Sequence, residues 1–360
     1  MICIAAFIVL GLLILTLPVI RLFNKKLAQN IWHLFKRSTY CFSRRATFRK
    51  CDSSFKDDVK NSLLKKVVLK HPRLIKPLSI LIEIISVLII VVTIWSILVG
   101  VKSLVSLYVY GTCNSENPSA CSLDNTEACT IESKPISFLE QPVEWLGKWF
   151  GDFGEAVAAI PVRMKSWQPA DYLPQNPGYY NPASKKPVAV DIFDPSCLVC
   201  QKSYKKQKQS GFFSKYKVAL LPYPIRSGDQ YKFPHSYKIV SLLEALKLRP
   251  PKNKVGSLPP EWQIVDFIYS KKAPNGDSYQ NAFNVFYSDD EVDKILSTWL
   301  NQLGYNDNEI RDLKLLAKSD KVKQIIEHNI YLVEKKIKTK KIPTIIYDGR
   351  RHDGEFQAKS

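Results

Sequence analysis

Two long apolar stretches dominate the pattern of apolar and polar residues along the chain. The first covers residues 1–20, and the second starts at Leu78 and continues in mainly apolar residues to Tyr110. Each supplies the roughly 20 apolar residues that an α-helix needs to cross a bilayer. The pattern therefore predicts transmembrane helices at 1–20 and 78–110. A buried helix of a soluble protein is the alternative for each.

Residues 111–186 show a weaker and more varied pattern. A polar loop with cysteines comes first, then an amphipathic helix, then a Pro-rich linker. The helix is indicated by apolar residues at alternating spacings of four and three from Leu139 to Ile160. Three interpretations stay open: it packs on its own domain, it lies on the membrane surface, or it joins copies of the chain into a homo-oligomer through 139–160.

Residues 187–360 alternate between strand and helix patterns. "PVAVDIF" (187–193) and "KVALLPYPI" (217–225) predict buried strands, and "CLVCQKSYKKQK" starts a helix between them. Helical patterns follow at 235–248, 259–272, 289–304, 307–319 and 320–337. The last part, "KIPTIIYDGRRHDGEF" (341–356), predicts a strand and a hairpin with its turn at Asp348-Gly349. This order predicts an α/β domain at 187–360 with a helical insertion at about 226–340.

Charge orients these segments about the membrane. The net charge is +19, and 16 Lys and Arg against three acidic residues lie between Arg21 and Lys76. Short basic loops stay in the cytoplasm, so residues 21–77 are expected there and everything after residue 110 on the other side. The basic charge follows the first apolar stretch, whereas in a cleaved signal peptide it would precede it, which favours an uncleaved anchor. Anionic lipid explains the basic loop more simply than nucleic acid, so no nucleic-acid partner is expected.

The eight cysteines are distributed over the segments of this predicted membrane topology. Cys3 lies in the first apolar stretch, and Cys41 and Cys51 are expected to be free thiols in the cytoplasmic loop. The predicted exported part holds Cys113, Cys121, Cys129, Cys197 and Cys200, in an environment where disulfides persist. If Cys197 and Cys200 pair, a structural disulfide is possible among the other three, and at least one of these is free or pairs with another chain.

The Cys197-x-x-Cys200 pair is a redox couple, half of a metal site, or two ordinary thiols. A zinc site needs four ligands, but His235 is the nearest histidine and no second C-x-x-C exists, so no metal is expected. Cys197 ends a strand and begins a helix, where the helix dipole stabilises a thiolate. We expect Cys197 to be the exposed nucleophile and Cys200 the resolving thiol. The redox-active disulfide Cys197–Cys200 is the only cofactor expected.

Residues next to the pair have expected roles. Asp191 lies in the apolar strand six residues before Cys197, where burial would raise its pKa and let it accept the proton of Cys200; a purely structural role is the alternative. Asp194, Pro195 and Ser196 form the active-site loop, with Asp194 or Ser196 capping the helix. Leu198 and Val199 complete the loop between the cysteines.

"VDIFDPSCLVC" resembles the active-site strand and helix start of the thioredoxin superfamily, and "KIPTIIYDG" resembles its second hallmark, a cis-proline before an edge strand. The resemblance implies a cis Pro343, with Ile342, Pro343 and Thr344 forming the substrate-binding wall. The long helical region before Pro343 is similar to the insertion of DsbA-like oxidoreductases. The resemblance covers about residues 187–356. Leu198-Val199 departs from the Pro-His of strongly oxidising members, which implies a more reducing pair.

These observations predict an α/β, thioredoxin-like fold with a helical insertion, preceded by two transmembrane helices and a stalk. The predicted protein is a two-pass membrane protein whose C-terminal domain lies on the periplasmic or extracellular side of the cell membrane. There it exchanges disulfides with cysteines of exported proteins or with a membrane redox partner. The alternatives are a non-catalytic thioredoxin-fold scaffold of the cell envelope and a dimeric disulfide isomerase or reductase.

Overall fold

The computed structural model describes residues 7–11, 21, 25–47, 75–113, 128–133, 136–250 and 258–358. The chain divides into two compact units, Met1–Val101 and Lys102–Ser360.

Unit 1 is helical. It contains α3 (Lys25–Ala46) and most of α5 (Ile75–Tyr110). Phe7 stacks on Phe35 and Phe42 of α3. Residues 7–11 are helical, and the rest of the predicted span at 1–20 lies outside the described residues. Cys41 is 1% exposed and disulfide-bonded, so the expectation that it is a free thiol was wrong; Cys51 lies outside the described residues.

Helix α5 has the length and composition of a membrane span. Its segment Lys76–Tyr110 has a mean hydropathy of 2.9. At 1.5 Å per residue its 36 residues extend about 54 Å, more than the roughly 30 Å of a bilayer core. Most of its apolar side chains are exposed, and Ile80, Val92 and Leu104 are each at least 60% exposed. The predicted second span is therefore one long helix that is apolar on every side.

Unit 2 is built on a five-stranded sheet. Its strands, listed in spatial order, are β2 (Gly178–Tyr179), β4 (Lys217–Pro222), β3 (Val188–Phe193), β8 (Thr344–Tyr347) and β9 (Arg350–Asp353). The central strand β3 runs parallel to β4 and antiparallel to β8. Its Ala189, Val190 and Ile192 are fully buried, as expected for a strand covered on both faces. Asp348 and Gly349 both have positive φ in the β8–β9 turn, which is typical of a two-residue hairpin.

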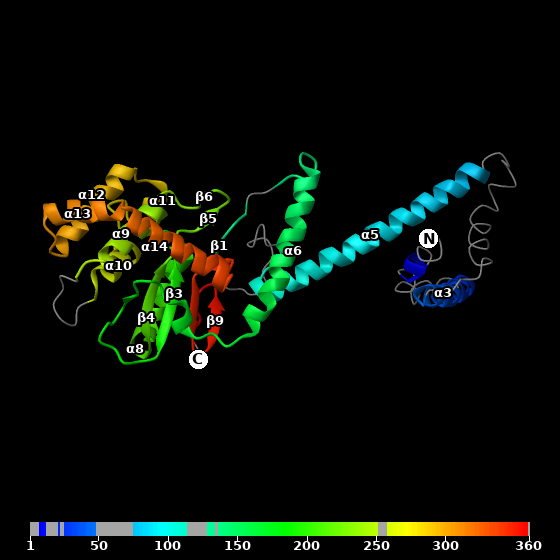
Figure 1. Cartoon of the computed structure of the whole chain (residues 1–360), viewed down its shortest axis with the longest axis horizontal. Coiled ribbons are helices and arrows are strands. Elements are labelled where there is room, and N and C mark those ends of the chain that lie inside the picture. Colours follow the sequence, from blue (N-terminus) through cyan, green and yellow to red (C-terminus); the bar gives the residue numbers. More distant parts are fainter. Residues whose placement is uncertain are drawn as a thin grey trace. The chain divides into compact units, whose positions relative to one another are not determined.

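Two small strand pairs flank this sheet. The first joins β1 (Cys129–Thr130) to β7 (Lys341–Ile342), and the second joins β5 (Arg226–Ser227) to β6 (Gln230–Tyr231). Figure 1 shows β1 beside the β5–β6 hairpin, at the edge where the sheet meets the helices.

The parallel strands β3 and β4 are connected through α7 (Leu198–Gln209) and the short α8 (Phe212–Lys215). The helical insertion contains α9 (Ser236–Lys247), α10 (Pro260–Ser270), α11 (Tyr279–Val285), α12 (Asp289–Gln302), α13 (Asp307–Ala317) and α14 (Asp320–Tyr331), followed by the π-helix η4 (Leu332–Ile337). Helix α9 packs on β4 on one side and on α13 on the other. Capping boxes at Ser288–Glu291 and Asn306–Glu309 fix the starts of α12 and α13. The predicted strand–helix–strand order and helical insertion are confirmed, and α11 is an additional helix.

The amphipathic segment forms α6 (Pro142–Met164), but of the expected apolar stripe only its C-terminal end, at Ile160, packs against the buried residues at the end of α5. Trp149, Ala156 and Ala159 are buried, and the two alanines pack against Val109 and Tyr110 at the end of α5. Leu139, Val143, Phe150 and Val157 of the predicted stripe are 44–91% exposed. Small residues allow the two helices to approach closely, which is why the alanine face is the buried one.

The Pro-rich segment is more than a linker. It contains the 3₁₀-helix η3 (Pro169–Tyr172) and the edge strand β2. Trp167 and Tyr172 are buried, and the ring of Tyr180 stacks on Phe213 with centroids 4.0 Å apart. The segment therefore belongs to the core that supports the sheet.

Candidate active site

Cys197 is the N-cap of α7, directly after the loop that leaves β3. Its Sγ accepts a hydrogen bond from the backbone N–H of Cys200 at 3.4 Å, and its carbonyl accepts one from Gln201 at 3.1 Å. The unpaired N–H groups and the positive dipole end of a helix stabilise negative charge at this position. The predicted strand-to-helix location of Cys197 is confirmed, and Cys197 itself takes the cap position expected for Asp194 or Ser196.

Asp194 holds the loop in shape. Its carboxylate accepts hydrogen bonds from the N–H groups of Ser196 and Ile225, at 2.8 and 2.7 Å, and from the hydroxyl of Ser236 at 2.7 Å. Burial raises the pKa of Asp194 to about 6, while these three bonds act in the opposite direction. Asp194 thus ties the loop to the end of β4 and to α9. These contacts are those of a residue that shapes the loop.

The helical insertion supplies residues that sequence reasoning missed. Gln280 and Asn284 of α11 donate side-chain N–H bonds to the carbonyl of Ser196, at 2.6 and 2.8 Å. The hydroxyl of Tyr269 in α10 donates to the carbonyl of Asp194 at 2.9 Å. No spacing in the sequence connects these side chains to a loop about 80 residues earlier, so only the fold could reveal them.

Cys200 lies beneath Cys197 as a free, buried thiol, 2% exposed. Burial raises its pKa well above the ordinary value, and the charges of Asp194 and Asp191 add to this effect. A thiol in this state needs a base nearby if it is to attack as a thiolate.

Asp191 lies in the core of β3, where the sequence placed it. Burial raises its pKa to about 7, against a lowering by the hydrogen bond from Gln207 Nε2 to Oδ2 at 3.0 Å. Its Oδ1 is buried and has no hydrogen-bond partner among the described residues. A cavity of about 10 Å³ is lined by Asp191, Cys200 and Pro343, which is at the lower limit of the space that can hold one water molecule. The structure thus brings the three predicted residues together.

The peptide bond between Ile342 and Pro343 is cis, as the resemblance implied. Ile342 belongs to β7 and pairs with another extended segment. Thr344 has a different place from the expected substrate-facing one: its hydroxyl donates to the carbonyl of Lys341 at 2.6 Å and contacts Thr339 at 2.9 Å. Its side chain points into the turn that precedes β8, and its hydrogen bonds stabilise that turn.

Cys197 is bonded to Cys129 in this structure. The expected Cys197–Cys200 disulfide is absent, and Cys197 is fully buried where exposure was expected. Cys129 lies in β1, which pairs antiparallel with β7 so that Cys129 stands opposite Ile342. The physical reason for both corrections is the same: the strand that carries Cys129 covers Cys197. Cys113 is also disulfide-bonded, and Cys121 lies outside the described residues.

Of the two residues between the cysteines, one is exposed and the other is buried. Leu198 is 48% exposed and Val199 is 8% exposed, so Leu198 presents an apolar side chain beside the cysteine. In the described part of the chain, no three His, Cys, Asp or Glu side chains gather in a way that could hold a metal ion.

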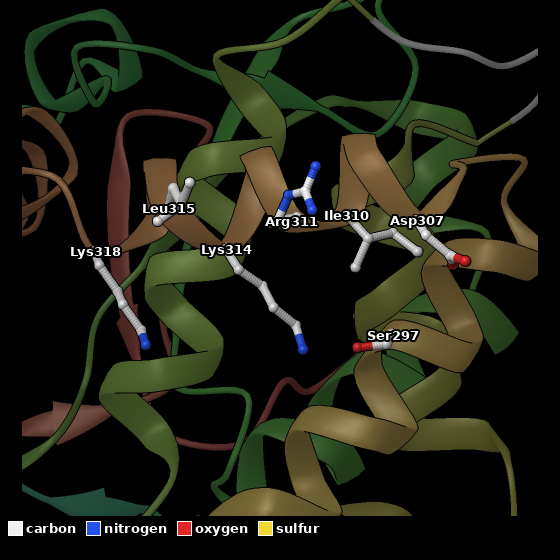
Figure 2. Close-up of a pocket in the computed structure, with 7 residues that line it drawn as sticks. All are labelled: Ser297, Asp307, Ile310, Arg311, Lys314, Leu315 and Lys318. Atoms are coloured by element: carbon white, nitrogen blue, oxygen red, sulfur yellow. The ribbon is translucent and has the colours of Figure 1, made fainter.

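A surface pocket of about 390 Å³ lies elsewhere, between α12 and α13. Figure 2 shows Arg311, Lys314 and Lys318 on the α13 side and Ser297 on α12. The residues that line it do not include any that surround Cys197, so it belongs to a different face of the insertion.

Taken together, the geometry suits thiol–disulfide exchange. One cysteine stands at a helix N-terminus next to a backbone edge that pairs with extended chain, and a second thiol lies beneath it beside a carboxyl group of raised pKa. Exchange passes through a disulfide between the first cysteine and another chain segment, which the second thiol then resolves.

No protein-family model and no curated protein matches the chain. Among solved structures it is similar to the thiol-disulfide exchange protein alpha-DsbA2 from Wolbachia pipientis, at 18% identity over 53% of this chain and 84% of that chain, with a TM-score of 0.37. ScsC of Proteus mirabilis in a compact conformation matches at 13% identity over 61% of this chain and 94% of that chain, with a TM-score of 0.37. MdbA, a thiol-disulfide oxidoreductase from Corynebacterium diphtheriae, matches at 15% identity over 51% of this chain and 91% of that chain, with a TM-score of 0.33.

These scores are low, so the description of the fold rests on the chain's own topology. A parallel β3–α7–β4 unit, a helical insertion after β4, and a cis-proline before the β8–β9 hairpin are all present. The C-terminal part of the chain has a thioredoxin-like fold with a helical insertion.

Proposed function

We propose that the protein is a membrane-anchored thiol–disulfide oxidoreductase that works outside the cytoplasm through Cys197 and Cys200. The observation that carries this proposal is the disulfide of Cys197 with a cysteine on an extended strand, which pairs with the backbone of Ile342 next to the cis-proline. A cysteine-containing segment of another protein can take the same position. Substrates would be cysteines of exported proteins or a redox partner in the membrane.

The residues divide the reaction as follows. The Cys197 thiolate attacks a substrate disulfide, or a substrate thiolate attacks Cys197 in its disulfide with Cys200, and either route gives a mixed disulfide on Cys197. Cys200 resolves the mixed disulfide from beneath. Asp191, whose pKa of about 7 lies near neutral, takes or returns the Cys200 proton. Ile342 aligns the substrate strand through its backbone. No cofactor besides the cysteine pair is needed for this chemistry.

The membrane anchor is proposed from α5 and from the first apolar stretch. The basic residues between the two stretches support a cytoplasmic position for that loop, which would put unit 2 on the periplasmic or extracellular side. Exported proteins are oxidised and isomerised on that side, where disulfides persist.

The proposal is tested by exchange activity of the full chain in detergent, using a peptide disulfide in a glutathione buffer. Cys197→Ser is expected to reduce turnover to the uncatalysed rate, and the double variant Cys129→Ser/Cys200→Ser, which also removes the cysteine bonded to Cys197, to form mixed disulfides without turnover. Ser297→Ala, in the separate pocket between α12 and α13, is the control and should keep turnover. Full turnover by Cys197→Ser would reject the proposal. A non-catalytic scaffold predicts that none of these variants differs from the wild-type chain.

A further inference from the structure

The segment 128–133 lies along the edge of β7 beside Cys197 in the manner of a bound peptide. Cys129 stands opposite Ile342 and Thr130 opposite Lys341 in an antiparallel pair, and the backbone N–H of Ile131 donates to the carbonyl of Lys340 at 3.0 Å. Thr130 and Ile131 are 3% and 6% exposed. Extended peptides bind to sheet edges in this mode, with the backbone supplying affinity and buried side chains supplying selectivity.

The other side of the segment is held by the β5–β6 hairpin. The N–H of Glu132 donates to the carbonyl of Arg226 at 3.1 Å, and the N–H of Gly228 donates to the carbonyl of Glu132 at 3.0 Å. The Glu132 carboxylate forms an ion pair with Lys232 and accepts a hydrogen bond from the hydroxyl of Ser227 at 3.0 Å. The segment is thus bound along both edges, independently of the disulfide.

We propose that Cys129 is a third redox cysteine, carried on a strand of this chain that fills the protein's own substrate position and competes with Cys200 for Cys197. This inference rests on the proposed function. It adds to the pair a catalytic residue that is 68 positions away in the sequence. A segment of the same chain then fills the substrate position along β7.

The exchange step conserves atoms and electrons. In the closed form, Cys197 is bonded to Cys129 and Cys200 is a thiol. The Cys200 proton passes to Asp191, and the Cys200 thiolate attacks Cys197 Sγ. The Cys197–Cys200 bond forms as the Cys129–Cys197 bond breaks, Cys129 leaves as a thiolate that takes a proton from solvent, and Asp191 returns its proton to solvent. Both forms contain one disulfide and one thiol, so no external oxidant or reductant takes part.

The two forms differ in their access to substrate. In the closed form Cys197 is fully buried and the edge of β7 is occupied by β1. In the open form β1 is no longer bonded to Cys197, and a substrate strand can replace it beside Ile342. A partner therefore has to displace β1 before it reaches Cys197, which shields the pair from small thiols.

The first test is a disulfide map of the full chain in detergent, quenched by acid, alkylated and digested without reduction. We expect Cys129-to-Cys197 linked peptides together with alkylated Cys200. Cys200→Ala should keep this linkage, and Cys129→Ser should convert the chain to Cys197-to-Cys200 linkage. A wild-type map in which Cys129 is linked to another cysteine, or is always a free thiol, overturns the inference.

A second test removes the non-covalent grip and keeps all cysteines. Glu132→Ala deletes the ion pair with Lys232, which lies near the surface, and is expected to shift the ratio of closed to open form toward open by about three- to tenfold. Ser133→Ala, at the next residue, is the matched control and should leave the ratio unchanged. An unchanged ratio in Glu132→Ala overturns the role of β1 as a bound occupant.

The third test is kinetic. A tethered segment acts at roughly millimolar effective concentration. With a cysteine peptide at about 0.1 mM as the probe, Cys129→Ser should therefore react about tenfold faster at Cys197 than the wild-type chain. If Cys129→Ser reacts at the wild-type rate while Cys197→Ser is inactive, the inference fails and the proposed function stands. If Cys197→Ser is active, the proposed function fails.

Discussion

Asp191 gives the account a quantitative test, because its burial has opposite consequences for stability and for catalysis. The carboxyl is buried in β3, which raises its pKa from 3.8 to about 7. The unfolded chain therefore releases this proton first, and the free energy of unfolding falls as the pH rises from about 4 to about 7. Above about pH 7 the loss is complete, and it amounts to about 4 kcal/mol at 1.36 kcal/mol per pKa unit.

Replacing Asp191 by Asn removes this ionisation and keeps the shape of the side chain. Relative to the wild-type chain, Asp191→Asn should gain about 3 kcal/mol between pH 4.5 and pH 8.5, most of it between pH 5 and 7. Poorly matched amide hydrogen bonds shift both values by a constant of about 1–2 kcal/mol. The difference between the two pH values is the informative quantity, because this constant cancels in it.

The assay is denaturant unfolding of unit 2 in the full chain, in detergent, with the disulfides kept oxidised in both proteins. Asp312→Asn on the exposed side of α13 is the matched control, and it should change stability equally at both pH values. The difference in free energy of unfolding between the wild-type chain and Asp191→Asn should depend on pH. The same difference at both pH values would show that burial does not raise the pKa of Asp191.

The same substitution should slow catalysis. Without the carboxylate, the Cys200 thiol has lost its nearby proton acceptor, and resolution of a mixed disulfide on Cys197 should slow by about 100-fold near neutral pH. The lifetime of the mixed disulfide measures this by quenched mass spectrometry. An unchanged lifetime would leave Asp191 with a structural role only.

Three further predictions follow from neighbouring contacts. Gln280→Ala and Asn284→Ala each remove one hydrogen bond to the Ser196 carbonyl, which is worth about 1 kcal/mol. Amide hydrogen exchange in the loop 194–200 should therefore accelerate about fivefold in each variant. The control Asn308→Ala should leave the exchange rate unchanged. Arg351→Met removes the ion pair with Asp353 and the hydrogen bonds to the carbonyls of Ile337 and Val109. It should lower the free energy of unfolding of unit 2 by about 3 kcal/mol. An unchanged free energy of unfolding would show that these buried bonds contribute little to stability. Neither Leu198 nor Val199 carries a cation that stabilises a thiolate, so the Cys197–Cys200 potential of Cys129→Ser, titrated with glutathione, should be below the roughly −120 mV of strong oxidants; a value that high would contradict this reasoning.

The sequence was most informative where one local signal decides the structure. The apolar runs at 188–193 and 217–222 became buried strands, Asp348-Gly349 became the hairpin turn, and Pro343 followed a cis peptide bond. Burial of Asp191 was predicted because the residues on both sides of it in the strand are apolar and expected to be buried.

The sequence was least informative where partners are chosen by tertiary structure. Cys129 was expected among the stalk cysteines, because nothing in its spacing shows that Cys129 and Thr130 pair with β7. Gln280 and Asn284 reach the loop only because α11 is folded onto it. In α6 the periodicity correctly predicted a helix, but packing selected the alanine face because the end of α5 requires a close approach.

If Cys197 exchanges disulfides with other proteins, the covalent intermediates on Cys197 can be trapped in cells. In Cys200→Ala alone, β1 is expected to occupy Cys197, so the trap is the double variant Cys129→Ser/Cys200→Ala in the full chain, produced in cells. We expect mixed disulfides with exported or membrane proteins that are cleaved on reduction and are absent when Cys197 is also replaced by Ser. Adducts that persist without Cys197, or no adducts from the double variant, would contradict this expectation.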